Sequence, residues 1–284
     1  MSDALIRELR SESRPEREET LGSKAQKRRI FLEGSGDVKF FEATRIADKF
    51  NVLFVTHENP AKGGKQFVID SVRKIPSTLG IVDMDHDLGS TDIKFSNNII
   101  DTSRSCCLFS WIMFVQGKTL IEVVKDFVRE LFKQDFRKQW EISRTVSANS
   151  EIFTNLVNEL TMARLFRGYN GNLPTSVGGL TELGIELEKL SDLSLATQHK
   201  IPPAYRVDFS DYKEKYREKL DDVGYNDHDV VDALHFLIYS SGIDLGPDKV
   251  SNSFLNFQSD KLGTVEQRED AAKQLVLKLL GEEE

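Results

Sequence analysis

The sequence predicts an α/β protein, in which a parallel sheet is followed by a mostly helical C-terminal region. Between residues 28 and 83, short continuous apolar runs alternate with segments whose apolar residues recur at helical spacing. This alternation is typical of a parallel sheet that is covered by helices on both faces. Beyond residue 117 the spacing of the apolar residues becomes helical, which indicates a region of helices.

The composition is that of a soluble globular protein, with 39% hydrophobic and 30% charged residues. No apolar run approaches the roughly 20 residues that a membrane helix needs, and the N-terminal residues are too charged for a secretory signal. The two cysteines, Cys106 and Cys107, are adjacent and cannot join distant segments, which fits a reducing compartment. We therefore expect a cytoplasmic protein without membrane contact. The net charge of -8 argues against a general nucleic-acid coat, although bound divalent cations can reverse the field locally.

Three strands and two helices are expected to alternate after a polar lead-in of residues 1–27. "RIFLEG" predicts a first strand that ends at Glu33 and Gly34, and "DVKFFEATRIADKF" predicts a helix. "NVLFVTH" predicts the second strand, "QFVIDSVRKI" the second helix and "TLGIVDMD" the third strand. A fourth strand lies either in "NNIID" or in "CCLFSWIMF". These elements define an expected domain of residues 28–117.

Helices are expected through the remaining residues, 118–284. "LIEVVKDFVRELFKQDFRKQW" carries an apolar stripe, and Thr119 with Glu122 has the pattern of a capping box in front of it. Thr264 and Gln267 form the same pattern at the start of the last helix. The further helices are expected at about 150–166, 181–190, 210–220, 227–240 and 264–280.

Carboxylates gather where the first and third strands end. Glu33 closes the first strand, and Asp83 and Asp85 close the third and point to the same side of it. Because ligands of an open parallel sheet bind at the carboxyl ends of its strands, the three carboxylates meet if the two strands are neighbours. Asp37, on the first turn of the next helix, and Asp87, after the third strand, lie nearby. An oxygen-only cluster suits Mg²⁺ or Mn²⁺, which can activate water for phosphodiester hydrolysis.

Basic side chains that could contact nucleic acid occur at two places in the chain, and each group has a second interpretation. Lys62 and Lys65 follow the second strand in a loop at the carboxyl edge of the sheet, where they either meet a phosphate or are simply solvated. On the helices after residue 119, a row of basic residues is either a nucleic-acid face or the solvated side of an amphipathic helix. That row consists of Arg129, Lys133, Arg137 and Lys138.

"FLEGSGDVKFFE", followed some fifty residues later by "GIVDMDHD", resembles the TOPRIM domain of topoisomerases, primases and OLD-type nucleases. The signature of that domain is a glutamate after the first strand and a DxD after a later one. The resemblance covers about residues 28–115 and implies a TOPRIM-type, Rossmann-like sheet with Mg²⁺- or Mn²⁺-dependent endonuclease activity. Glu33-Gly34 and Asp37, followed by a Phe-rich helix, look closest to the small TOPRIM effector subunits of bacterial anti-phage systems such as PARIS.

The resemblance also implies roles and partners. Glu33 would be a metal ligand or general base, Asp83 and Asp85 metal ligands, and Asp37 and Asp87 candidate ligands of a second metal. Lys65, at the same edge, is the candidate for contact with the phosphate or leaving group. The substrate would be nucleic acid, either DNA or RNA. An ABC-type ATPase would be the partner that releases or triggers this toxin, and the active form would be a homodimer.

The chain departs from that family on the strand after the DxD. Many relatives carry an acidic residue on that strand, whereas "TSRSCCLFSWIMF" has none and Asp101 stands just before it. Two other functions remain open. A HAD-type phosphatase would use Asp83 as nucleophile and Asp85 as acid, but it leaves Glu33 unexplained. A non-catalytic interaction module could keep the TOPRIM shape. A calcium loop fails, because a strand precedes the aspartates and Lys94 stands where the loop needs a glutamate.

Overall fold

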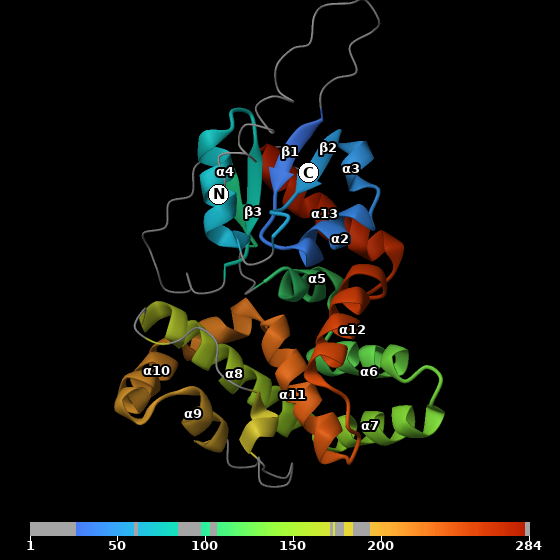
Figure 1. Cartoon of the computed structure of the whole chain (residues 1–284), viewed down its shortest axis with the longest axis vertical. Coiled ribbons are helices and arrows are strands. Elements are labelled where there is room, and N and C mark those ends of the chain that lie inside the picture. Colours follow the sequence, from blue (N-terminus) through green and yellow to red (C-terminus); the bar gives the residue numbers. More distant parts are fainter. Residues whose placement is uncertain are drawn as a thin grey trace, which may run out of the picture. The chain divides into compact units, whose positions relative to one another are not determined.

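The computed structural model describes residues 27–59, 62–84, 98–102, 107–170, 173, 179–183 and 194–281 (Figure 1). The chain forms two compact units. The first comprises the described residues of Met1–Asp83, Lys94–Asp101 and Ala272–Glu284, and the second those of Met84–Ile93 and Thr102–Ala271. The domain boundary expected from the sequence, after residue 117, differs from this division. The last helix passes from the second unit into the first between Ala271 and Ala272.

The first unit is built on a sheet of four parallel strands in the order β2-β1-β3-β4. The expected α/β class is therefore confirmed, and "NNIID" rather than "CCLFSWIMF" supplies the fourth strand. The strands are β1 Arg28–Phe31, β2 Val52–Val55, β3 Leu79–Val82 and β4 Ile99–Asp101, and the helices between them are α2 Ser35–Glu42, α3 Ile46–Lys49 and α4 Lys65–Lys74.

Apolar side chains cover both faces of the sheet, which is why its strands lack a polar alternation. On one face Phe31 packs edge-on against Phe67 of α4, with 5.6 Å between the ring centroids. On the other face Phe54 of β2 stacks on Phe41 of α2 at 4.4 Å. The end of α13 (Val265–Leu280) from Ala272 onward belongs to the same unit, and Leu275 and Val276 are fully buried there.

Gly80 lets α4 approach β3 closely. A Cβ atom on Gly80 would lie 2.6 Å from Cγ1 of Val68 and 3.2 Å from Cγ2 of Val72, both on α4. We expect Gly80→Ala to destabilise the sheet by about 1–3 kcal/mol, because overpacking forces a helix or a buried side chain to shift. The measurement is hydrogen exchange of the β3 amides. Gly246→Ala is the control, since nothing lies within 4 Å of a Cβ atom there, and equal protection losses in both variants would contradict the expectation.

The helix expected over "DVKFFEATRIADKF" is interrupted. α2 ends before Ala43, and α3 begins at Ile46. Between them the hydroxyl of the buried Thr44 donates to the carbonyl of Phe41 at 2.6 Å, and it also accepts from the N–H of Ile46. Threonine competes in this way for backbone groups that a continuous helix would use.

The described residues of the second unit are mainly helical, and those after residue 117 agree with the mostly helical region that the sequence predicted. Of the helix expected at 181–190, residues 184–190 lie outside the described residues. Its helices not yet given are α5 Leu108–Gln116, α6 Leu120–Leu131, α7 Phe136–Ala148, α8 Ser150–Asn170, η3 Leu180–Leu183, α9 Ser194–Lys200, η5 Pro203–Tyr205, α10 Arg206–Val223, α11 Asp227–Ser240 and α12 Pro247–Asp260. Phe127 of α6 contacts Phe254 and Phe257 of α12 edge-on, so aromatic rings fill the core between these two helices. None of the helices in the described residues is long and apolar enough to cross a membrane.

Both predicted capping boxes are present. Thr119 accepts from the N–H of Glu122 at the start of α6, and the N–H of Thr119 donates back to that carboxylate. This hydrogen bond from the Thr119 backbone, with the Thr119 hydroxyl, holds the pKa of Glu122 below its usual range. Thr264 and Gln267 form the second box, in front of α13. The helix expected through "LIEVVKDFVRELFKQDFRKQW" is divided, however, because Asp135 caps a new helix, α7, by accepting from the N–H of Lys138.

Candidate functional site

The carboxyl ends of β1 and β3 lie side by side at the point where the strand order reverses. The chain runs from β1 outward to β2, and then returns past β1 to form β3 on its other side. Crossover connections in parallel sheets are right-handed, so this reversal places the first and second crossovers on opposite faces. A crevice outside the strand ends at such a switch point is where open α/β sheets bind their ligands.

Glu33 and Asp83 meet at this switch point. The Oε1 atom of Glu33 accepts a hydrogen bond from the backbone N–H of Asp83, with 2.8 Å between oxygen and nitrogen. Both side chains are partly buried. The expectation that the ends of the first and third strands are neighbours is therefore confirmed, and a carboxylate from each strand stands at the edge. Their roles in catalysis or metal binding stay predictions.

The loop after β2 is fastened to the backbone of Glu33. The carbonyl oxygen of Glu33 accepts from the N–H of Gly64 at 2.8 Å and from the hydroxyl of Thr56 at 3.3 Å. Gly64 has a φ of 82°, in the left-handed region that favours glycine. Because Lys65 follows Gly64 and begins α4, this loop brings the predicted phosphate-binding lysine to the same edge of the sheet. Lys62 lies in the same loop and its side chain is exposed.

Asp37 has a structural role that the sequence analysis did not anticipate. Its Oδ2 atom accepts from the N–H of Gly34 at 2.9 Å, which closes the N-terminus of α2. A carboxylate in the first turn also interacts favourably with the helix dipole. This hydrogen bond holds Asp37 beside Glu33 and Gly34. Binding of a second metal ion by Asp37 remains a prediction.

His57 presents an unpartnered donor after β2. Its Nδ1 atom accepts from the N–H of Asn59 at 2.9 Å, so the proton is on Nε2. In the described part of the chain, Nε2 is buried and has no hydrogen-bond partner. An N–H group suits a phosphate oxygen and not a cation.

Asp101 belongs to "NNIID", one of the two segments in which the sequence predicted the fourth strand. It is the last residue of β4 and pairs with Val82 of β3, so a third strand ends in a carboxylate beside the Glu33 and Asp83 edge. Nζ of Lys278 lies 3.9 Å from Oδ1 of Asp101. The strand after the DxD therefore ends in an acidic residue, whereas the apolar run "CCLFSWIMF" has none.

The oxygen donors at this edge are carboxylates that follow neighbouring strands. Glu33 and Asp83 supply carboxylates from neighbouring strands, and carboxylate oxygens are what Mg²⁺ and Mn²⁺ prefer. Asp85 and Asp87 lie outside the described residues. Within the residues that the structure does describe, no three or more histidine, cysteine, aspartate or glutamate side chains form a group that could hold a metal.

Comparisons of the chain with models of known protein families, with curated proteins and with solved structures found no match.

Proposed function

We propose that this chain is a Mg²⁺- or Mn²⁺-dependent nuclease with a TOPRIM-type sheet. The observation that carries the proposal is the contact between Glu33 and Asp83 at the topological switch point. The sequence signature has a glutamate after the first strand and a DxD after a later one, and in this chain the carboxylate of Glu33 accepts from the backbone N–H of Asp83, the first aspartate of that DxD. Carboxylates that follow two neighbouring strands would have a chemical use at this position, which is to hold a cation and to accept a proton from water.

Each residue has a defined part in the proposal. Glu33, Asp83 and Asp85 would hold the cation, and Asp37 and Asp87 are the candidates for a second one. A divalent cation supplies an acidified water and neutralises charge that develops on the leaving oxygen. Glu33 would be a metal ligand or the general base, and its backbone is held by hydrogen bonds from Gly64 and Thr56 to its carbonyl oxygen. Lys65 contributes positive charge toward the phosphate from the start of α4.

The biological setting is proposed from the sequence resemblance alone. The chain would be the toxin of a bacterial anti-phage system, silent until an ABC-type ATPase partner releases or activates it. The active form would be a homodimer, and structured RNA such as tRNA is included among its proposed substrates.

Cleavage assays with purified protein test the proposal. We expect end-labelled RNA or DNA to be cut in the presence of Mg²⁺ or Mn²⁺, but not in EDTA, and we expect Glu33→Ala to abolish the cutting. Toxicity on expression without the ATPase partner should disappear in the same variant. Hydrolysis of a phosphomonoester that Asp83→Asn abolishes and Glu33→Ala preserves would favour the phosphatase. Absence of cleavage with and without the partner would favour a non-catalytic module.

A further inference from the structure

Two large aromatic side chains are exposed on the outer face of α7. The side chain of Phe136 is 77% exposed and that of Trp140 is 64% exposed. The helix packs into the second unit through Ile142 and Val146, which are fully buried. Phe136 and Trp140 are four residues apart, so they lie on the same side of the helix, about 6 Å apart along its axis.

Positive charge surrounds these rings. Helix α7 carries Arg137, Lys138 and Arg144 against one acidic residue, Glu141, in a chain whose net charge is -8. The guanidinium of Arg144 lies 5.3 Å from the centroid of the Trp140 ring, in a cation–π contact. Across the part of the chain that the structure describes, neither Arg137 nor Arg144 forms an ion pair, whereas Lys138 is paired with Asp135.

A hollow of about 430 Å³ runs along the same face, lined in part by Arg137, Trp140, Glu141 and Arg144. The rest of its lining consists of the small side chains of Thr145, Ala148 and Asn149 and contains no further large apolar residue. An obligate protein interface would instead surround exposed aromatic rings with further apolar side chains.

We propose that this α7 face binds unpaired nucleotides of a nucleic acid. Bases stack on Trp140 and Phe136, and the phosphates between them contact Arg137 and Arg144. Aromatic rings interleaved with cations are the means by which proteins hold single strands, because every base offers a ring face for stacking. The choice of nucleic acid over another anionic partner rests on the proposed function, but binding at α7 does not require cleavage.

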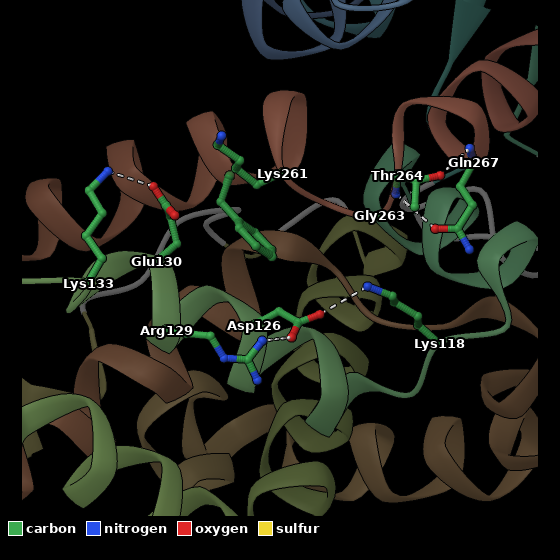
Figure 2. A pocket seen from close by; sticks show the side chains of 10 residues that line it. Lys118, Asp126, Arg129, Glu130, Lys133, Lys261, Gly263, Thr264 and Gln267 are labelled. Atoms are coloured by element: carbon green, nitrogen blue, oxygen red, sulfur yellow. Dashed lines mark hydrogen bonds and ion pairs between the residues drawn. The ribbon is translucent and has the colours of Figure 1, made fainter. Parts of the chain in front are cut away.

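The other basic hollow of the second unit does not have this character. It also measures about 430 Å³ and lies between α6 and the start of α13. Figure 2 shows that three of its cations are in ion pairs: Lys118 and Arg129 both pair with Asp126, and Lys133 pairs with Glu130. Of its basic residues only Lys261 has no ion pair in the described residues, so that hollow has little uncompensated charge for a phosphate.

Binding is measured without metal, so that cleavage cannot contribute. The probe is a fluorescein-labelled single-stranded RNA of mixed sequence in EDTA, compared with the same sequence as a duplex. We expect Trp140→Ala to weaken single-strand binding about 5- to 150-fold, which corresponds to 1–3 kcal/mol per stacked base. Trp140→Phe should restore most of it. Arg137→Ala with Arg144→Ala should lower the slope of log K against log salt by about 1.4, since each phosphate contact contributes about 0.7 for single strands.

Controls come from exposed residues elsewhere in the second unit. Tyr239 on α11 is 52% exposed and Lys249 on α12 is exposed, so Tyr239→Ala and Lys249→Ala remove an exposed ring and an exposed charge. Both should bind RNA as wild type does. A Trp111→Phe variant leaves Trp140 as the only tryptophan, and its fluorescence should be quenched by the RNA. Circular dichroism checks that each variant is folded.

The proposal is overturned if Trp140→Ala binds the single strand as tightly as wild type does. If, in addition, that variant changes from dimer to monomer in ultracentrifugation, the α7 face is an interface between copies of the chain instead. Binding that depends on Trp140, in a protein that cleaves nothing with any metal, would support the α7 surface and count against the proposed nuclease. Metal-dependent cleavage together with RNA binding that does not depend on Trp140 would support the proposed nuclease and count against the α7 surface.

Discussion

Glu33→Gln is expected to reduce metal-dependent cleavage by about 10²–10⁴-fold, the range associated with loss of a general base. Glutamine has the volume of glutamate and an amide oxygen that can still accept from the N–H of Asp83, which is 2.8 Å from Oε1 in the native protein. It cannot accept a proton, and it contributes no negative charge to a cation. The variant therefore separates the chemical part of Glu33 from its part in joining β1 to β3. Initial rates at saturating Mg²⁺ and the melting temperature are measured together.

Glu58 provides the matched control for Glu33→Gln. It follows β2 at the same edge of the sheet, and its side chain is exposed. Glu58→Gln removes the same charge and should leave the cleavage rate unchanged. If Glu33→Gln cleaves as fast as wild type does, Glu33 has no part in the chemistry. If the melting temperature of Glu33→Gln falls and the loss of cleavage rate is no larger than the loss of folded protein, the role of Glu33 is structural. Glu33→Ala should in addition be less stable, by about 1 kcal/mol, through loss of the hydrogen bond.

The sequence could predict that Glu33 and Asp83 lie at the same edge of the sheet, because this follows from two general properties of parallel sheets. Continuous apolar strands require a parallel sheet, and side chains at strand ends gather at one edge of it. The hydrogen bond itself could not be predicted. It depends on the register between β1 and β3, in which Phe31 lies opposite Gly80, and neighbouring strands without a polar face carry no sequence signal for their register.

The fourth strand was ambiguous for a physical reason. "CCLFSWIMF" is apolar on all sides, and a short apolar run does not distinguish a buried strand from a buried helix. In the structure, Leu108, Phe109, Ile112 and Met113 are buried as parts of helix α5, which ends at Gly117 with a φ of 61°. Asp101, at the end of β4, was noted only as the acidic residue before this run and not as a candidate ligand. The acidic positions "DHD", by contrast, were recognised, although Asp85 and Asp87 lie outside the described residues.

The basic row after residue 119 shows what sequence spacing cannot resolve. Arg129, Lys133 and Lys138 each pair with a carboxylate three residues earlier, at Asp126, Glu130 and Asp135. Such pairs lie on the solvent-exposed side of a helix, and because their charges are already compensated they contribute little to recognition of another molecule. Arg137 differs from these three because it lies beside the exposed Trp140 in the hollow on α7. Charge alone could not separate it from its neighbours.

Asp229→Ala is expected to destabilise the second unit by about 3–5 kcal/mol, the cost of removing one partner of a buried ion pair. Asp229 of α11 accepts from Nε and Nη2 of Arg164 on α8, both at 2.9 Å, and its side chain is only 5% exposed. Arg167, one turn further along α8, is 4% exposed, and its Nε and Nη1 atoms have no hydrogen-bond partner within the described residues. Burial lowers the pKa of Arg167, as does the like charge of Arg164, while Asp229 and Asp232 oppose this. Loss of Asp229 would leave two guanidinium groups without their nearest negative charge.

Urea denaturation followed by tryptophan fluorescence measures this loss in the correct part of the chain, because both Trp111 and Trp140 belong to the second unit. Glu130→Ala is the matched control, since its pair with Lys133 is exposed and its loss should cost no more than about 1 kcal/mol. Replacing both partners, Arg164→Met with Asp229→Leu, should recover part of the stability, because the desolvation of both charges is then avoided. Recovery should remain incomplete, since Arg167 would still be buried without the favourable charge of Asp229. If Asp229→Ala and Glu130→Ala lower the urea midpoint equally, the buried pair does not stabilise the contact between α8 and α11.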